Sequence, residues 1–280
     1  MAHEIGSIKY EEEFILNSRG LKLFTCRWLP ENRDPKALIF ICHGYAMECS
    51  ISMEGTGTRL AKAGFAVYGI DYEGHGKSSG LEGYIPCFDD LVNDCSDHFT
   101  TICERKQNTR KLRFLLGESM GGAVVLLLHR KKPNYWDGAV LVAPMCKVRS
   151  NTYCYKGRPR LKTGNELLMV SIDVEQNLHQ VSLPFIIVHG GDDKVTDPSI
   201  SKLLYESASS SDKTFKLYPG MWHALTSGEP PENMDLVFTD IIVWLKDRAA
   251  IGNSRLESEL KREFDTQSQP VDGKKLVLDL

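Results

Sequence analysis

Apolar runs of strand length alternate with amphipathic segments of helix length through most of this chain. The runs contain few polar residues, which is typical of strands buried on both faces of a sheet. Because the alternation extends from residue 37 to residue 247, it predicts an α/β fold with a mainly parallel central sheet and helices on both faces. The predicted strands are residues 37–42, 65–71, 112–116, 138–143, 185–188 and 214–218. The predicted helices are residues 52–63, 88–103, 124–132, 165–180, 198–207 and 232–247.

The helical period is clearest in residues 88–103, where apolar side chains recur on one face. Asp90, Asp94 and Asp97 lie on the opposite face, so the segment predicts an amphipathic helix packed on the sheet. The apolar face consists of Phe88, Leu91, Val92, Cys95, Phe99, Ile102 and Cys103.

The N-terminal part of the chain departs from this alternation. Residues 13–17 and 21–29 flank a turn-like Asn-Ser-Arg-Gly sequence. This pattern predicts an antiparallel hairpin, which we expect at an edge of the sheet.

The C-terminal part becomes charged and polar after residue 250. Leu256, Leu260 and Phe264 have the spacing of a short amphipathic helix, and we expect the rest to form a mobile tail. We therefore predict one α/β domain at residues 1–250 and a charged tail at residues 251–280.

The composition favours an ordinary globular protein. Of 280 residues, 42% are hydrophobic, and 34 basic and 37 acidic side chains give a net charge of −3. We expect no nucleic-acid partner, because no strong positive footprint follows from this balance. The N-terminus resembles no signal peptide, and no apolar run approaches the roughly 20 residues of a membrane span. We expect a cytoplasmic protein, with membrane contact at most peripheral.

The chain has eight cysteines and none of them forms a C-x-x-C motif. Several lie in apolar stretches, which favours buried reduced thiols and a cytosolic setting. A disulfide between Cys146 and Cys154 stays open as an alternative. We expect no metal and no cofactor.

The chemistry of the chain centres on Gly117-Glu118-Ser119-Met120-Gly121, which lies between a predicted buried strand and a predicted helix. This context is the one in which a Gly-x-Ser-x-Gly sequence forms a nucleophile elbow. Ser119 would sit on a strained turn that needs small neighbours at Gly117 and Gly121. The Met120 N–H would begin the helix, where it can face an oxyanion. The alternative is a glycine-rich helix start without chemistry.

A serine nucleophile needs a base and an acid that orients the base. His43, His75, His189 and His223 follow predicted strands, but only His223 follows all of them and has acidic residues upstream. The order serine, acid, histidine is that of an α/β-hydrolase, so His223 is the predicted base. The acid could be Asp192, Asp193 or Asp197, because spacing alone does not separate the three.

A second turn lies at His43-Gly44-Tyr45, at the end of a strand that should neighbour the nucleophile strand. The glycine would let the backbone turn so that the Tyr45 N–H becomes a second oxyanion donor. A purely structural turn is the alternative. The sequence Gly74-His75-Gly76 has no phosphate-loop context, and we interpret it as a structural turn.

Five motifs occur in an order that is specific when they are taken together. They are His43-Gly44-Tyr45-Ala46-Met47-Glu48, Asp71-Tyr72-Glu73-Gly74-His75-Gly76-Lys77-Ser78, Gly117-Glu118-Ser119-Met120-Gly121-Gly122, His189-Gly190-Gly191-Asp192-Asp193 and Tyr218-Pro219-Gly220-Met221-Trp222-His223. The chain resembles the monoacylglycerol lipase family over residues 10–248, and most of all its plant branch, often labelled caffeoylshikimate esterase-like. The resemblance implies an α/β-hydrolase fold, with Ser119 as nucleophile, Asp193 as acid and His223 as base. It also implies an oxyanion hole made by the Tyr45 and Met120 amides.

The chain departs from this family in one region. Members carry a helical cap of several dozen residues between the strand that ends in Ala-Pro and the helix before the acid strand. Here the family-like flanks 143–147 and 155–163 are separated only by residues 148–154. The resemblance therefore implies a truncated cap, with residues 146–163 as its remnant. In the family the cap walls the acyl pocket, so its loss exposes apolar surface.

Together the motifs and the resemblance predict a serine carboxylester hydrolase. The expected substrate is a small amphiphilic ester, of the monoacylglycerol or lysophospholipid type, cleaved through an acyl-enzyme. Cleavage of caffeoyl shikimate and acyl transfer to another alcohol are alternatives within enzymes. A catalytically weak ligand-binding or interaction protein is the alternative from another class. The sequence leaves the oligomeric state open.

Overall fold

The computed structural model describes residues 7–146 and 160–267, with side chains to residue 262. Its centre is a sheet in which the strand order is β1-β2-β4-β3-β5-β6-β7-β8. The two pairs β1–β2 and β2–β4 are antiparallel, and the other neighbours run parallel. The strands are β1 (Ile8–Leu16), β2 (Lys22–Pro30), β3 (Leu38–Cys42), β4 (Ala66–Ile70), β5 (Arg113–Glu118), β6 (Gly138–Val142), β7 (Phe185–Gly190) and β8 (Lys213–Tyr218).

The predicted α/β architecture is confirmed. Every residue of β3, β4, β6 and β7 is buried, as the continuous apolar runs required. The parallel strands bring their carboxyl ends to one edge of the sheet, where open α/β sheets bind ligands. The hairpin of β1 and β2 lies at the edge of the sheet, and it begins at Ile8, earlier than predicted.

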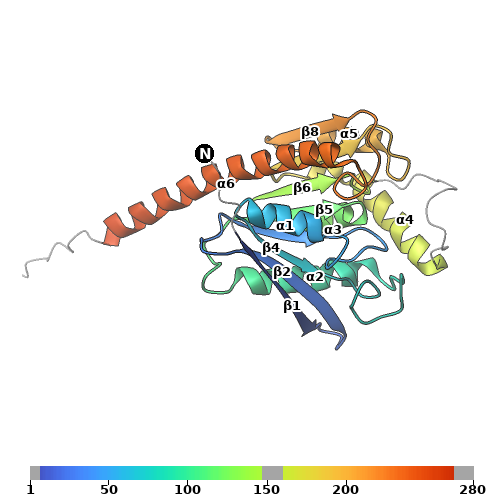
Figure 1. The fold of residues 1–280 in the computed structure, drawn as a ribbon, viewed down its shortest axis with the longest axis horizontal. Helices are drawn as coiled ribbons and strands as arrows, with labels where there is room; N and C mark the ends of the chain where they lie inside the picture. Colours follow the sequence, from blue (N-terminus) through green and yellow to red (C-terminus); the bar gives the residue numbers. More distant parts are fainter. Residues whose placement is uncertain (1–6, 147–159, 268–280) are drawn as a thin grey trace, which may run out of the picture.

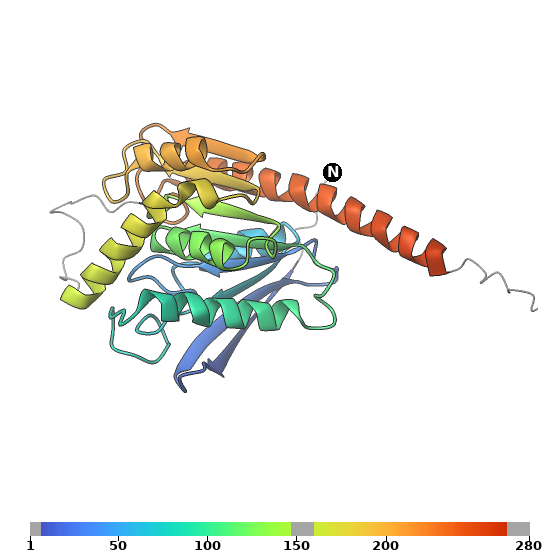
Figure 2. The ribbon, with the colours of Figure 1, turned by 180° about the vertical axis from the view of Figure 1, so that it is seen from behind.

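Helices cover both faces of the sheet. Figure 1 shows α1 and α6 in front of it, and Figure 2 shows α2, α3, α4 and α5 on the reverse side. Each face carries its own buried apolar layer, so the domain has three layers. The helices are α1 (Glu54–Lys62), α2 (Phe88–Cys103), α3 (Met120–Lys131), α4 (Leu161–Gln176), α5 (Pro198–Ser207) and α6 (Pro231–Gln267), with a 3₁₀ turn, η1, at Leu178–Gln180.

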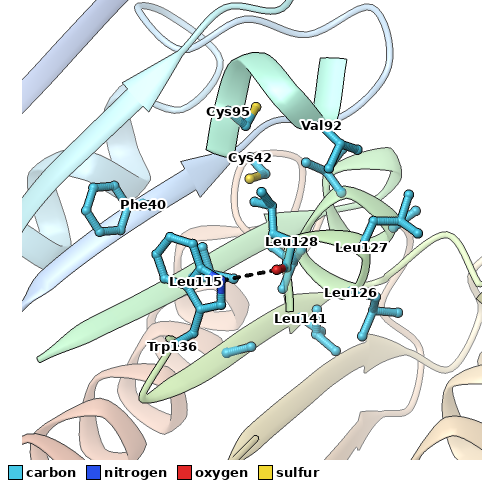
Figure 3. Packing of buried hydrophobic residues seen from close by; sticks show 14 of the residues in the cluster. Phe40, Cys42, Val92, Cys95, Leu115, Leu126, Leu127, Leu128, Trp136 and Leu141 are labelled. Carbon is cyan, nitrogen blue, oxygen red and sulfur yellow. Dashed lines mark hydrogen bonds between the residues drawn. The ribbon is translucent and has the colours of Figure 1, made fainter. Parts of the chain in front are cut away.

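The layer under α3 is built from side chains of neighbouring strands and of the helix itself. Figure 3 shows Leu115 and Leu141 facing Leu128, all of them buried. The indole Nε1–H of Trp136 donates to the Leu128 carbonyl at 3.3 Å, which satisfies the polar atom of this buried ring. The nucleophile turn thus rests on a closely packed support.

The aspartates of α2 do not all face water. Asp94 is 6% exposed, although its helical position predicts a polar surface. Its carboxylate accepts hydrogen bonds from the Asn17 amide at 3.0 Å and from the Arg19 guanidinium at 2.8 Å. The turn of the β1–β2 hairpin therefore covers this side of α2, a contact that helical periodicity cannot reveal.

The last helix is longer than predicted. α6 runs to Gln267 without a break at residue 247 or 250 and projects beyond the sheet in Figure 1. Ala249 is buried, and a Cβ at Gly252 would lie 2.6 Å from Leu112 Cδ1, so the helix packs closely where the composition suggested its end. The predicted short amphipathic helix around residues 256–264 is thus part of α6, while the domain boundary at residue 250 and the mobile tail stay predictions.

Two further predictions fall partly or wholly outside the described residues. Most of the predicted cap remnant, residues 146–163, belongs to the undescribed gap, and so does residue 154 of the alternative disulfide. The described cysteines are all free thiols. Among the described helices, none is long and apolar enough to cross a membrane.

Candidate active site

Ser119 lies on a strained turn between β5 and α3. Its φ of 55° and ψ of −118° are unfavourable for a residue with a Cβ. Three backbone hydrogen bonds hold this conformation. The Ser119 N–H donates to the Val142 carbonyl at 3.0 Å, and the Ser119 carbonyl accepts from Gly122 at 2.9 Å and Met145 at 2.8 Å. Strain of this kind persists only where the surroundings fix it, which is typical of functional turns.

The two glycines around Ser119 are required by close backbone contacts. A Cβ at Gly121 would lie 1.9 Å from the Cys42 carbonyl oxygen, and one at Gly117 would lie 2.3 Å from the Gly121 carbonyl oxygen. Neither position has room for a side chain. The turn therefore packs directly onto the end of β3.

The His43-Gly44-Tyr45 turn lies beside the nucleophile turn. A Cβ at Gly44 would lie 3.4 Å from the Ser119 Cβ. His43 is fully buried, and its Nε2 accepts from the Tyr72 N–H at 3.3 Å, so its Nδ1–H donates to the Gly44 carbonyl at 2.8 Å. Burial lowers the pKa of His43 to about 3, and the ring stays neutral. His43 thus shapes the turn.

Tyr45 and Met120 follow the two residues that approach each other here, Gly44 and Ser119. Tyr45 follows Gly44 in the turn, and its hydroxyl donates to the Gly83 carbonyl at 2.8 Å. Met120 is fully buried as the first residue of α3. Their backbone N–H groups thus belong to two elements that meet at Ser119, and their role as oxyanion donors stays a prediction.

Asp193 is the acid whose side chain contacts His223. Its Oδ2 accepts from His223 Nδ1 at 2.7 Å and from His189 Nε2 at 3.0 Å. Its Oδ1 accepts from the Val195 and Thr196 N–H groups at 2.7 and 3.1 Å. Burial raises the pKa of Asp193, but the hydrogen bonds from His189 and His223 outweigh it and hold the pKa well below its usual value.

The other two candidate acids have different surroundings. Asp192 is exposed. Asp197 is the N-cap of α5, and its side chain accepts from the Ser199 N–H at 3.0 Å. The structure therefore separates three aspartates that spacing could not.

The loop of His223 is fastened to the loop of Asp193. The Gly191 N–H donates to the Tyr218 carbonyl at 2.8 Å, and the Asp192 N–H donates to the Met221 carbonyl at 3.0 Å. These contacts follow from the parallel pairing of β7 with β8, which ends at Gly190 and Tyr218. They bring Asp193 and His223 to the same edge of the sheet as Ser119.

The family described as serine aminopeptidase, S33 matches residues 33–154 and 147–231, well over half of the chain. The chain belongs to this family. It is 31% identical over an alignment of 292 positions to caffeoylshikimate esterase from Arabidopsis thaliana, covering 85% of this chain and 88% of that protein. It is 30% identical to human monoglyceride lipase, covering 87% and 93% of the two chains.

A solved structure of a soluble variant of Saccharomyces cerevisiae monoglyceride lipase, in complex with a substrate analog, has the same fold. Its TM-score is 0.74 at 19% identity, and the match covers 88% of this chain and 96% of that one. The predicted α/β-hydrolase fold is confirmed, and the chain is a hydrolase of the monoglyceride lipase-like serine hydrolase group.

The comparisons also bear on the chain's length relative to its relatives. The alignment with the Arabidopsis protein spans 292 positions, more than the 280 residues of this chain, so it includes gaps here. The two matched family segments meet and overlap at residues 147–154. A shortened cap would produce both observations, and the cap remnant stays a prediction.

The sequence interpretation gave no role in the site to several side chains that the structure brings into it. His189 was weighed only as a base, yet its Nε2–H donates to Asp193 while its Nδ1 accepts from the Ser201 hydroxyl at 2.8 Å. The Thr196 hydroxyl lies 2.9 Å from Asp193 Oδ2. Glu118 accepts from the Thr226 hydroxyl at 2.7 Å inside the protein. The only sequence signal for them was membership of a motif, for Glu118 and His189, or proximity to one, for Thr196 and Thr226.

The remaining glycine-flanked histidine has a local role. The His75 ring is 3% exposed, and its Nδ1–H donates to the Glu73 carbonyl at 3.0 Å. Burial lowers the pKa of His75. This arrangement agrees with the structural turn predicted at Gly74-His75-Gly76.

Proposed function

We propose that this protein is a serine carboxylester hydrolase that cleaves monoacylglycerols or lysophospholipid-type monoesters. The observation that carries the proposal is the 2.7 Å bond between Asp193 and His223, at the sheet edge where Ser119 occupies its strained turn. The names of its relatives, caffeoylshikimate esterase and monoglyceride lipase, support an ester substrate.

In the proposed mechanism, His223 Nε2 takes the proton of Ser119 as the serine oxygen attacks the ester carbonyl. Asp193 holds the Nδ1–H tautomer and stabilises the imidazolium. The Tyr45 and Met120 N–H groups bind the oxyanion of the tetrahedral intermediate. The alcohol leaves with the proton from His223, and water activated by His223 then releases the acid.

Exposed apolar side chains beside His223 and on α4 support an amphiphilic substrate. Trp222 is 60% exposed directly before His223, and Leu161 is 95% exposed at the start of α4. Leu168 and Met169 add further exposed apolar surface on the same helix. We propose a cytoplasmic enzyme that contacts lipid surfaces peripherally through such side chains.

Three other functions are compatible with this site. The Arabidopsis relative favours an aromatic ester such as caffeoyl shikimate, and the same acyl-enzyme could pass its acyl group to an alcohol other than water. The predicted truncated cap favours a catalytically weak ligand-binding protein, because less surface would exclude water from the acyl group.

Product analysis with monoolein, lysophosphatidylcholine and caffeoyl shikimate tests the substrate class. We expect glycerol release from monoolein that disappears in Ser119→Ala, and labelling of the folded wild type by a fluorophosphonate probe. Hydrolysis that survives in Ser119→Ala would contradict the proposed nucleophile. Folded wild-type protein that takes up no probe would instead favour the ligand-binding function.

A further inference from the structure

Glu118 is a buried carboxyl that the proposed triad does not use. It is the last residue of β5, directly before Ser119, and only 2% of it is exposed. Phe114 and Leu116 of the same strand belong to the apolar layer beneath α6, and Glu118 continues their alternation toward that layer. A carboxyl at such a position loses hydration and needs a partner.

The partner of Glu118 is Thr226, three residues after His223. The Thr226 hydroxyl donates to Glu118 Oε2 at 2.7 Å, and Thr226 is itself 6% exposed. Within the described ranges, no lysine or arginine forms an ion pair with Glu118. This hydrogen bond therefore joins the residue before the nucleophile to the loop of the base.

The charge of Glu118 is linked to that of His223. Burial raises the pKa of Glu118, while the Thr226 hydrogen bond and the positive charge of His223 act in the opposite direction. A protonated imidazole favours the ionised carboxylate, and by the same interaction the carboxylate favours the imidazolium.

The acidic groups around His223 come from three parts of the site. Asp193 contacts Nδ1 and is in turn bonded by His189 of β7. In the loop of His223 itself, Glu229 accepts from the Trp222 N–H at 2.6 Å. Glu118 belongs to β5 and interacts electrostatically with His223, so a negative charge on it adds to that of Asp193 from another element.

We propose that Glu118 is a positioning residue for the base. Through Thr226 it fixes the His223 loop against the nucleophile turn, and its charge stabilises the imidazolium that forms when His223 takes the proton of Ser119. The second part rests on the proposed function, because it assigns that proton transfer to His223.

The test compares variants that separate the hydrogen bond from the charge. Thr226→Val removes the hydroxyl at nearly constant volume, Thr226→Ser keeps it, and Glu118→Gln keeps an acceptor while removing the charge. Thr239→Val, at an exposed threonine of α6, is the matched control. Each variant is assayed with p-nitrophenyl butyrate across pH 5–9 and checked for folding by circular dichroism.

We expect Thr226→Val to lower kcat roughly 10- to 100-fold with little change in KM. This loss is a part of the roughly 10²- to 10⁴-fold rate enhancement that a positioned general base supplies. Thr226→Ser should stay within about twofold of the wild type, because it retains the donor. In Glu118→Gln the acid limb of the kcat/KM profile should move to lower pH, since the imidazolium loses a stabilising charge.

The proposal is overturned if Thr226→Val and Glu118→Gln lose activity only in proportion to their folded fraction and keep the wild-type pH profile. The titration of the His223 C2–H by NMR, assigned with His223→Gln, gives a readout that needs no turnover. Its midpoint should fall in Glu118→Gln and stay fixed in Thr239→Val. An inactive wild type whose midpoint still falls contradicts the proposed function alone. An active wild type with an unmoved midpoint contradicts the role of Glu118 alone.

Discussion

The acid side and the nucleophile side of the site hold their buried carboxyls in different ways. Asp193 is surrounded by donors from two histidines, a threonine hydroxyl and two backbone amides. Glu118 is paired with one threonine hydroxyl. Their pKa values move in opposite directions, down for Asp193 and up for Glu118. Burial alone therefore does not set the direction of a pKa shift, because the donors outweigh it for Asp193 but not for Glu118.

The difference follows from backbone position. Asp193 lies in a loop after β7, where the Val195 and Thr196 N–H groups are free of the sheet and turn toward its carboxylate. Glu118 is the last residue of β5 and pairs with Val142 of β6, so the backbone donors around it are used by the hydrogen bonds of the sheet. A carboxyl within a strand must therefore find its donor on a distant side chain.

We expect the largest loss of activity from a substitution of Asp193, on the acid side of the site. Asp193→Asn should lower kcat by about 10³- to 10⁴-fold, because an amide cannot hold the required tautomer or stabilise the imidazolium. Steady-state hydrolysis of a soluble ester measures this loss. Asp192→Asn is the matched control next to it, and its exposed side chain predicts near-wild-type turnover. Equal losses in the two variants would contradict the assignment of the acid.

Stability as a function of pH sharpens the contrast between the two carboxyls. The lowered pKa of Asp193 adds stability that is present above its unfolded pKa of about 3.9 and lost as pH falls toward the folded pKa. The raised pKa of Glu118 has the opposite sign, so its ionisation costs stability as pH rises above the unfolded pKa of about 4.3.

Denaturant unfolding at pH 4 and pH 7 checks these signs. Between the two values, Asp193→Asn should lose stability relative to the wild type, and Glu118→Gln should gain it. Changes of the same sign in both variants would show that the two sites do not differ as described.

The strain on the nucleophile side predicts a smaller effect. Ser119→Gly should unfold with a free energy about 1 kcal/mol higher than Ser119→Ala, because glycine relieves strain of roughly 1–3 kcal/mol and gives back part of it as unfolded-chain entropy. Both variants should lack esterase activity, so stability is the readout. An alanine variant as stable as the glycine variant would argue against strain at this turn.

The smallest effect concerns the third aspartate of the acid loop. Asp197→Ala should lower the free energy of unfolding by about 1 kcal/mol, the typical value of an N-cap side chain, with kcat close to that of the wild type. Thermal unfolding together with the ester assay measures both. A loss of turnover beyond about tenfold would place Asp197 in the catalytic machinery instead.

Much of the fold was predictable because its signals are local. The apolar runs around residues 37–42 and 138–143 specify buried strands wherever they pack, and the period of residues 88–103 specifies a helix. The spacing of residues 256–264 predicted a helix there, but not its continuity with α6, where Gly252 packs closely on Leu112, a residue distant in sequence. Asp94 was likewise misplaced, since the hairpin that covers it is distant in sequence.

The sequence by itself determined the chain order of serine, acid and histidine and the need for glycines around Ser119, since turn sterics act over a few residues. Only the tertiary structure decided which aspartate contacts His223 and which carboxyl stays short of donors. Those choices depend on hydrogen bonds between residues far apart in sequence, such as the Glu118–Thr226 bond, which spans 108 positions. Such partners become neighbours only when parallel strands align their carboxyl ends.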